Sequence, residues 1–231
     1  MSTEHKKKEE VAIPLDRYIK QLTDFYEEKK KMINTVTTAV LVVLALALAY
    51  FLWYVPKQQK EAALAIFKAE RYFGMDSLQL ALDGDKTHLG LLAVIDKYSS
   101  TKAGNNAKYM AGICYLQLGK YDESIRYLKK FRTNNKLLSV QTLGAIGDAY
   151  MEKNDMDNAV KYYKKAVSKH PNELITPVFL WKLGQLYEMQ GNWKEALSCF
   201  EILQQEYPYP QWSESMDAEK RIAFAKEKIG K

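Results

Sequence analysis

Arginine, histidine and cysteine are scarce in this sequence, and each shortage excludes a class of function. Few of the 34 basic residues are arginine, and the formal net charge of +6 is spread along the whole chain. Without an arginine-rich stripe, nucleic acid is not expected as the main partner. The histidines are His5, His88 and His170, and none lies near another or near a cysteine. A zinc site needs three or four converging ligands, so none is expected.

The two cysteines, Cys114 and Cys199, form no CxxC pair and are far apart in the chain. This spacing gives neither a metal cluster nor a disulfide framework, and we expect two free, buried thiols. No pairing of a nucleophile with a base is evident, so we expect no catalytic residues, no cofactor and no enzyme activity. Apolar residues make up 47% of the chain, which is enough to build a core.

One long apolar run stands out near the start of the chain. Residues Met32–Val55 carry no charge, and 24 residues at about 1.5 Å each reach roughly 36 Å, enough to cross a hydrocarbon layer of about 30 Å. Lys29–Lys31 precede the run, and aromatic residues crowd its other end, as in an interfacial belt. We expect a transmembrane helix that Pro56 ends. The aromatic residues are Tyr50, Trp53 and Tyr54.

Two other interpretations of this run are a buried core helix and a cleaved signal peptide. The run is apolar on every face and longer than a core helix needs. Ala45–Ala47 resembles a cleavage site, but about thirty residues precede the run, and it exceeds the usual 7–15 apolar residues of a signal peptide. A retained single span is therefore the prediction.

The lysine triplet Lys29–Lys31 also predicts the orientation of the span. Basic residues near the membrane favour the cytoplasmic side, so the N-terminus is expected in the cytoplasm and the C-terminal domain on the opposite side, which in a bacterium is the periplasm. The tail, residues 1–31, includes a short amphipathic helix that either docks or simply extends the span. Its apolar stripe is Leu15, Ile19, Leu22 and Tyr26.

The rest of the chain contains a repeat that begins with glycine and, three residues later, tyrosine. These pairs are Gly112/Tyr115, Gly147/Tyr150 and Gly184/Tyr187, so the glycines are spaced by 35 and 37 residues. A turn, a small residue and a large residue follow in each unit; the small residues are Ser124, Ala159 and Ala196, and the large ones are Leu128, Tyr163 and Phe200.

This pattern resembles the tetratricopeptide repeat, whose period is 34 residues. Each unit is a pair of antiparallel helices that cannot bury its apolar face alone, so the units stack into an all-α solenoid. Glycine or alanine is expected where the helices cross; in the second unit these are Gly147 and Ala159. We expect three units, at residues 105–139, 140–176 and 177–211.

Irregular helices are expected at both ends of the solenoid. Residues 56–104 should form an opening pair, with one helix over Ala62–Phe73, stopped by Gly74, and another over Thr87–Tyr98. Residues 212–231 should form a capping helix that ends at Gly230.

The whole layout consists of a charged tail, one span, an irregular pair, three repeat units and a cap. It resembles the family of ancillary Sec-translocon subunits, which are bacterial inner-membrane proteins with a periplasmic tetratricopeptide domain. The resemblance implies a non-enzymatic scaffold beside the protein-export channel, in contact with channel subunits and with periplasmic chaperones or unfolded clients. Its members carry no catalytic residues.

The first helix of each repeat should line a concave protein-binding groove. Trp181 either faces this groove or packs in the core. Aromatic and methionine side chains in a concavity suit loosely specified peptides. The candidate groove residues are Asn106, Tyr109, Ile113, Gln117, Gln141, Asp148, Glu152, Val178, Trp181, Gln185, Glu188 and Met189.

Two other functions fit the same architecture. One is an adaptor in cell-envelope assembly or division, and the other is a receptor on an organelle surface with its domain in the cytosol. The sequence alone does not distinguish these from the channel subunit, since none of them requires a different motif.

Overall fold

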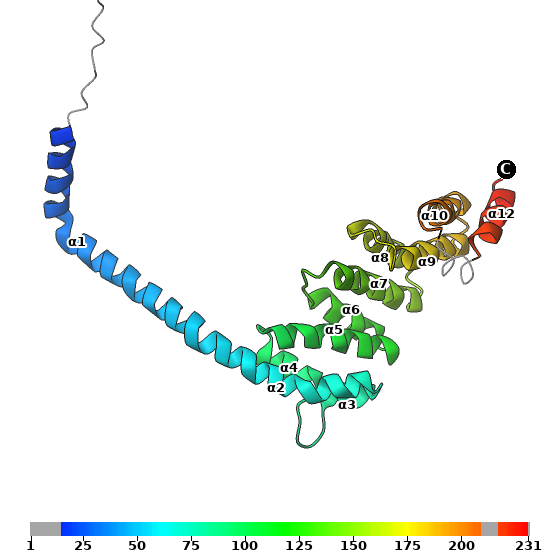
Figure 1. Cartoon of the computed structure of the whole chain (residues 1–231), viewed down its shortest axis with the longest axis horizontal. Helices are drawn as coiled ribbons and strands as arrows, with labels where there is room; N and C mark the ends of the chain where they lie inside the picture. Colours follow the sequence, from blue (N-terminus) through cyan, green and yellow to red (C-terminus); the bar gives the residue numbers. More distant parts are fainter. Residues whose placement is uncertain (1–14, 209–216, 231) are drawn as a thin grey trace, which may run out of the picture. The chain divides into compact units, whose positions relative to one another are not determined.

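The computed structural model describes residues 15–208 and 217–230. All regular secondary-structure elements in those ranges are helices (Figure 1). The chain forms two units, residues 1–57 and 58–231, and each is described by itself. The helices are α1 (Leu15–Ala49), the π-helical turn η1 (Tyr50–Tyr54), α2 (Val55–Gly74), α3 (Leu78–Asp83), α4 (Leu91–Tyr98), α5 (Lys102–Gln117), α6 (Tyr121–Lys130), α7 (Lys136–Glu152), α8 (Met156–Lys169), α9 (Thr176–Met189), α10 (Trp193–Glu206) and α12 (Ala218–Lys228).

Helix α1 includes both the amphipathic stripe of the tail and most of the apolar run. Together with η1 and α2 it forms a continuous helix, Arg17–Gly74, that by length and composition could cross a membrane. Within it, the Thr35 and Thr38 hydroxyls donate to the carbonyls of Lys31 and Asn34, each at 2.8 Å. These bonds satisfy both hydroxyl donors within the helix itself.

Pro56 does not end this helix, contrary to the sequence-based prediction. The chain widens into η1, where the Val55 amide donates to the Tyr50 carbonyl, and α2 then continues to Gly74. Inside a continuous helix, proline lacks one backbone donor and its ring clashes with the preceding turn. The wider π turn just before Pro56 relieves that clash.

Helices α2 to α4 pack with α5 into one apolar cluster at the start of the second unit. Ile66 on α2, Leu82 on α3 and Val94 on α4 are all buried in it. The predicted helix over Thr87–Tyr98 is shorter than expected, because α4 begins only at Leu91, and the six-residue helix α3 was not predicted.

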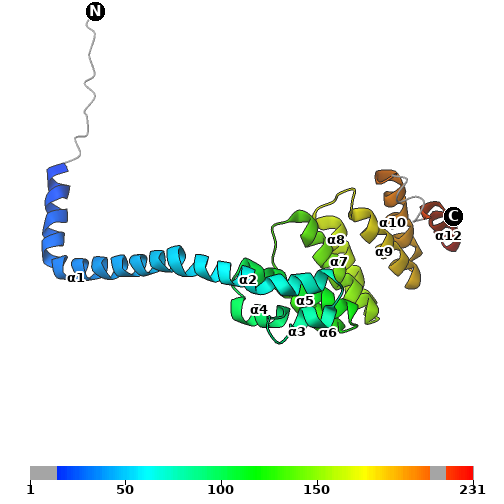
Figure 2. The same ribbon diagram turned by 60° about the horizontal axis from the view of Figure 1, so that its bottom comes forward.

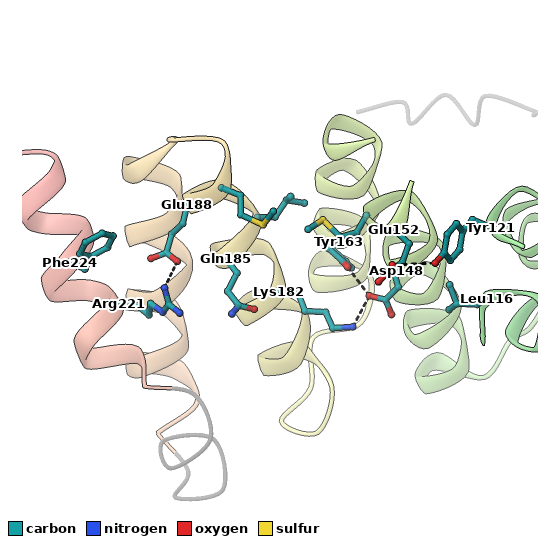
Figure 3. Close-up of a pocket in the computed structure, with 13 residues that line it drawn as sticks. Leu116, Tyr121, Asp148, Glu152, Tyr163, Lys182, Gln185, Glu188, Arg221 and Phe224 are labelled. Atoms are coloured by element: carbon teal, nitrogen blue, oxygen red, sulfur yellow. Dashed lines mark hydrogen bonds and ion pairs between the residues drawn. The ribbon is translucent and has the colours of Figure 1, made fainter. Parts of the chain in front are cut away.

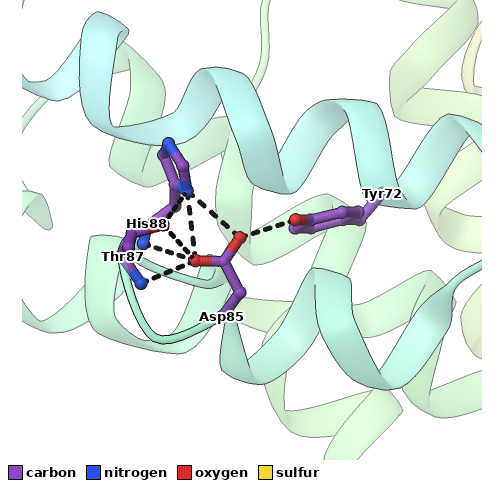
Figure 4. A network of polar contacts seen from close by, with 4 residues as sticks. All are labelled: Tyr72, Asp85, Thr87 and His88. Carbon is purple, nitrogen blue, oxygen red and sulfur yellow. Dashed lines mark hydrogen bonds and ion pairs between the residues drawn. The ribbon is translucent and has the colours of Figure 1, made fainter.

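A side-chain network explains why Thr87 is not helical (Figure 4). The Asp85 carboxylate accepts hydrogen bonds from the Thr87 amide and hydroxyl and from the His88 amide, at 2.7–2.8 Å, and from the Tyr72 hydroxyl at 2.6 Å. An aspartate that bonds the amides two and three residues ahead stabilises a turn in place of a helix. The Tyr72 bond ties this turn to α2.

Three helical hairpins follow, α5/α6, α7/α8 and α9/α10, and they stack in chain order (Figures 1 and 2). Each turn uses one residue with positive φ: Gly119, Asn154 and Gly191. In each turn, the next amide bonds back to the carbonyl of the repeat tyrosine, as Lys120 does to Tyr115 at 2.8 Å. This is the Schellman ending of a helix, repeated three times.

The repeat glycines lie under the large residues of the second helices. A Cβ atom added at Gly112, Gly147 or Gly184 would meet the side chain of Leu128, Tyr163 or Phe200 at 2.6 Å. We expected Ala159 opposite Gly147, and the three atoms nearest to a Cβ at residue 147 belong to the ring of Tyr163, one turn further along α8. The solenoid fold itself is as the repeat pattern predicts.

The two cysteines lie in different parts of the core. Cys114 on α5 packs with the opening helices, whereas Cys199 on α10 packs with α8, α9 and α12. Both thiols are free and buried. Helix α12 packs on α10, and its buried residues are Ile222 and Ala225. Of the capping helix predicted over residues 212–231, residues 212–216 and 231 lie outside the described residues.

Candidate protein-binding groove

A groove of about 910 Å³ lies across the second half of the solenoid (Figure 3). Helices α7, α9 and α12 supply most of its lining, and single residues of α5, α6 and α8 complete it. The lining residues are Leu116, Tyr121, Asp148, Met151, Glu152, Tyr163, Lys182, Gln185, Leu186, Glu188, Met189, Arg221 and Phe224.

Helical spacing places the polar side chains on one face of each helix. Asp148 and Glu152 are four residues apart on α7, and Lys182, Gln185 and Glu188 recur every three residues on α9. Residues three or four apart lie on the same side of a helix. The repeat glycines Gly147 and Gly184 lie beside these stripes, where they pack against side chains of α8 and α10.

Asp148 is the best-satisfied carboxylate of the groove. Its Oδ1 atom accepts a hydrogen bond from the Tyr163 hydroxyl at 2.7 Å and lies 2.6 Å from the Lys182 ammonium. These contacts join α7, α8 and α9. Burial, followed by the Asp148 charge, raises the pKa of Tyr163 far above its ordinary value, so the phenol stays protonated and acts as a hydrogen-bond donor.

Glu188 is the most buried carboxylate of the groove, with 9% of its side chain exposed. Its Oε2 atom accepts a hydrogen bond from Arg221 at 2.9 Å, which joins α9 to α12. Its Oε1 atom is buried and has no hydrogen-bond partner. Burial raises the pKa of Glu188 above its ordinary value, while the charge of Arg221 opposes that rise.

The remaining lining combines one further polar contact with accessible apolar surface. The Tyr121 hydroxyl donates to Glu152 Oε2 at 3.3 Å. Met189 and Phe224 are 58% and 40% exposed, unusual values for large apolar side chains in a concave surface. Such a mixture, with few fixed polar groups and adaptable apolar ones, suits a peptide rather than a small rigid molecule.

Five of the predicted candidates line this groove, and seven do not. The five are Asp148, Glu152, Gln185, Glu188 and Met189. Asn106, Gln117 and Gln141 are exposed outside it. Tyr109 packs on Phe131, and Ile113 lies half-buried in the same part of the core. Val178 packs beside Leu180 and Leu203. The first helices therefore contribute unequally to the groove lining: α5 supplies one residue and α7 supplies three.

Trp181 packs against the core rather than lining the groove. It is half-buried, and its ring lies 5.3 Å from that of Phe200 between centroids. The Arg221 guanidinium lies 5.8 Å from the centroid of the same indole. Trp181 therefore supports the groove indirectly, because it holds the arginine that pairs with Glu188.

Sequence reasoning missed the contributions of second helices and of α12. Tyr121 and Tyr163 lie on second helices, which were assigned wholly to packing. Arg221 and Phe224 lie about one turn apart on α12, and neither belongs to its buried residues. This pair of a basic and an aromatic residue was the sequence pattern that could have indicated that α12 contributes to the groove. Among the residues that the structure describes, no group of three or more histidine, cysteine or acidic side chains could hold a metal ion.

Comparison with known proteins agrees with this architecture. The tetratricopeptide repeat pattern matches residues 109–173 and, overlapping them, 145–209. The chain is 30% identical over 116 residues to the uncharacterized protein ycf37 of Guillardia theta; the match covers 48% of this chain and 64% of the length of that relative. The crystal structure of MamA protein superposes with a TM-score of 0.53 at 17% identity, covering 73% of this chain and 82% of that one. The MamA likeness concerns the fold alone.

Proposed function

Because residues 109–209 carry tetratricopeptide repeats, which serve as protein–protein interaction scaffolds, we propose that this chain is a membrane-tethered, non-enzymatic scaffold whose groove binds segments of partner proteins. The observation that carries the proposal is the groove of about 910 Å³ with exposed Met189 and Phe224 in a concave, partly charged surface. Large apolar side chains left exposed in a concavity are typical of protein-binding sites.

The tether in this proposal is the apolar part of helix Arg17–Gly74. The uncharged run Met32–Val55 supplies the span, and Lys29–Lys31 favour a cytoplasmic N-terminus. The repeat domain then lies across the membrane from the tail, which in a bacterial inner membrane is the periplasm. In that position it would receive clients as they leave the membrane.

The finer proposal is an ancillary subunit of the Sec protein-export channel that links the channel to periplasmic chaperones or clients. Its support is the resemblance in layout: tail, span, irregular pair, repeats and cap. Adaptors in envelope assembly or division, and organelle receptors with a cytosolic domain, share that layout and are separated from it by experiment.

Site-specific photo-crosslinking in intact membranes tests the groove and the partner together. A photoreactive amino acid at Met189 should crosslink a partner, whereas the same group at exposed Lys161 on α8 should not. Recovery of channel subunits or exported clients at Met189 supports the Sec role, and recovery of wall-synthesis proteins supports the envelope alternative. Equal crosslinking at both positions would contradict a specific groove.

A topology reporter tests the tether. A C-terminal fusion to an enzyme that is active only in the cytoplasm should be silent in cells. Activity of that fusion would reverse the proposed orientation and favour a domain exposed to the cytosol.

A further inference from the structure

The groove contains one acceptor without a donor, and it belongs to its most buried carboxylate. Glu188 is 9% exposed, and Arg221 occupies only its Oε2 atom. The Oε1 atom is buried and unpartnered. A buried carboxylate oxygen without a hydrogen bond is unfavourable, so a donor supplied by a ligand would stabilise it.

The two cations of the groove make their contacts at other oxygens. Lys182 pairs with Asp148, and Nη1 of Arg221 donates to Oε2 of Glu188. Glu152 accepts from Tyr121. The lining holds three carboxylates and two cations, so its formal balance is −1 and a ligand with one positive charge would neutralise it.

Apolar side chains line the same groove as this oxygen. Met189 follows Glu188 in the chain, and Phe224 lies one turn after Arg221 on α12; both line the groove, and they are 58% and 40% exposed. A ligand group that binds Glu188 therefore has a thioether and an aromatic ring in the same groove to pack against. Exposed side chains reorient within nanoseconds, so these two can adapt to the ligand.

We propose that Glu188 Oε1 receives the ammonium group of a lysine in the bound protein segment, and that a neighbouring apolar side chain of that segment packs on Met189 and Phe224. This inference rests on the proposed function and specifies the chemistry of the segment. The long methylene stem of lysine suits the apolar walls, and its charged end suits the buried oxygen.

Lysine fits this site better than arginine does. A guanidinium is recognised best by a carboxylate that offers both oxygens side by side, and Arg221 already holds one oxygen of Glu188. A single free acceptor matches a compact ammonium.

Selection from a displayed library of random decapeptides provides the test. The full-length protein is held in lipid nanodiscs, and peptides are selected on wild type, Glu188→Gln and Glu173→Gln. Each variant removes one negative charge, and Glu173 is exposed between α8 and α9 and does not line the groove, so Glu173→Gln is the control for diffuse electrostatic attraction. Wild type and Glu173→Gln should enrich lysine next to a bulky apolar residue, and Glu188→Gln should not.

The recovered peptide also permits a change that leaves the protein untouched. Replacing its lysine by norleucine should weaken binding to wild type about tenfold to a hundredfold, the effect of losing one charged hydrogen bond. Replacement by arginine should weaken it less. Neither change should matter for Glu188→Gln. Because the peptide carries the substitution, a folding defect of the Glu188 variant cannot produce this result.

The outcomes separate this inference from the proposed function. Peptides that bind without lysine enrichment, and that a crosslink at Met189 blocks, would leave the groove as a binding site but overturn the role of Glu188. Equal enrichment of lysine by wild type and Glu188→Gln would also overturn the role of Glu188. In that case an ordered water would be the hydrogen-bond donor to Oε1. Recovery of no peptide at all would contradict both.

Discussion

The ring of Tyr163 lies directly over Gly147, so closely that a Cβ atom at residue 147 would come within 2.6 Å of two ring carbons. The same ring donates its hydroxyl to Asp148 in the groove. One side chain therefore connects the crossing of α7 and α8 to the binding surface. Tyr163 is 3% exposed, so it has no room to move away.

Gly147→Leu should destabilise the repeat domain. The new side chain would enter the space of the Tyr163 ring, and overpacking of a core typically costs about 1–3 kcal/mol. Thermal unfolding followed by circular dichroism should show a lower melting temperature. Glu152→Ala, at an exposed position five residues further along α7, should change the stability by no more than about 0.5 kcal/mol. If Glu152→Ala destabilised the domain more than Gly147→Leu does, the assignment of the core face and the groove face of α7 would be wrong.

The crossing of the repeat helices was predictable because it depends on residue size at a fixed period. Gly112, Gly147 and Gly184 recur with their large partners, and no other fold explains that spacing as well. The opening helices were less predictable. The Asp85 turn and the π turn before Pro56 depend on contacts with other helices, which periodicity does not describe.

The groove was only partly predictable for a related reason. Helical spacing identifies which residues of α7 share a face, and so it found Asp148 and Glu152. It does not say how far the concave surface extends along the stack. In the structure the groove lies closer to the C-terminal end of the stack than predicted, because α12 contributes Arg221 and Phe224.

Ser124→Ala should stabilise the domain. Ser124 is 0% exposed, and its hydroxyl has no hydrogen-bond partner. Alanine occupies the matching position in the other two units, at Ala159 and Ala196, both fully buried. Removing an unsatisfied buried hydroxyl should raise the free energy of unfolding by about 1 kcal/mol or more. Urea unfolding measures this difference directly.

The control for that substitution is Ser198→Ala. Ser198 lies at an exposed position within α10, so this change gains helix propensity without removing a buried hydroxyl. Ser124→Ala should raise the free energy of unfolding by more than Ser198→Ala does. An equal gain from both variants would show that helix propensity alone accounts for the effect.

Both cysteines should resist thiol reagents in the folded protein. Burial raises the pKa of Cys114 and of Cys199 to about 11. The thiolate is the reactive form, so at pH 8 each thiol is almost wholly protonated as well as inaccessible. Labelling with a chromogenic disulfide reagent should be slow in buffer and should reach two thiols per chain in denaturant. Fast labelling of the native protein would contradict the burial of these residues.

The last prediction concerns acid stability and the Asp85 turn. Hydrogen bonds, that of the Tyr72 hydroxyl first and those of Thr87 next, hold the pKa of Asp85 well below its usual range. An unfolded aspartate titrates near a pKa of about 3.9. A carboxyl with a depressed folded pKa contributes stability above its unfolded pKa, and that contribution is lost as the pH falls through the folded value. Asp85→Asn should therefore be less stable than wild type at pH 7.

The stability difference between wild type and Asp85→Asn should shrink steadily below about pH 4, because protonation makes the wild-type residue resemble the amide. Tyr72→Phe removes the largest cause of the depressed pKa, so it should shift the acid-induced loss of stability toward higher pH. Asp157→Asn, at an exposed position on α8, should follow the wild-type curve. Unfolding by urea from pH 7 to pH 2 measures all four proteins. A wild-type and Asp85→Asn difference that is independent of pH would show that the Asp85 bonds do not distinguish its charged form from its neutral form.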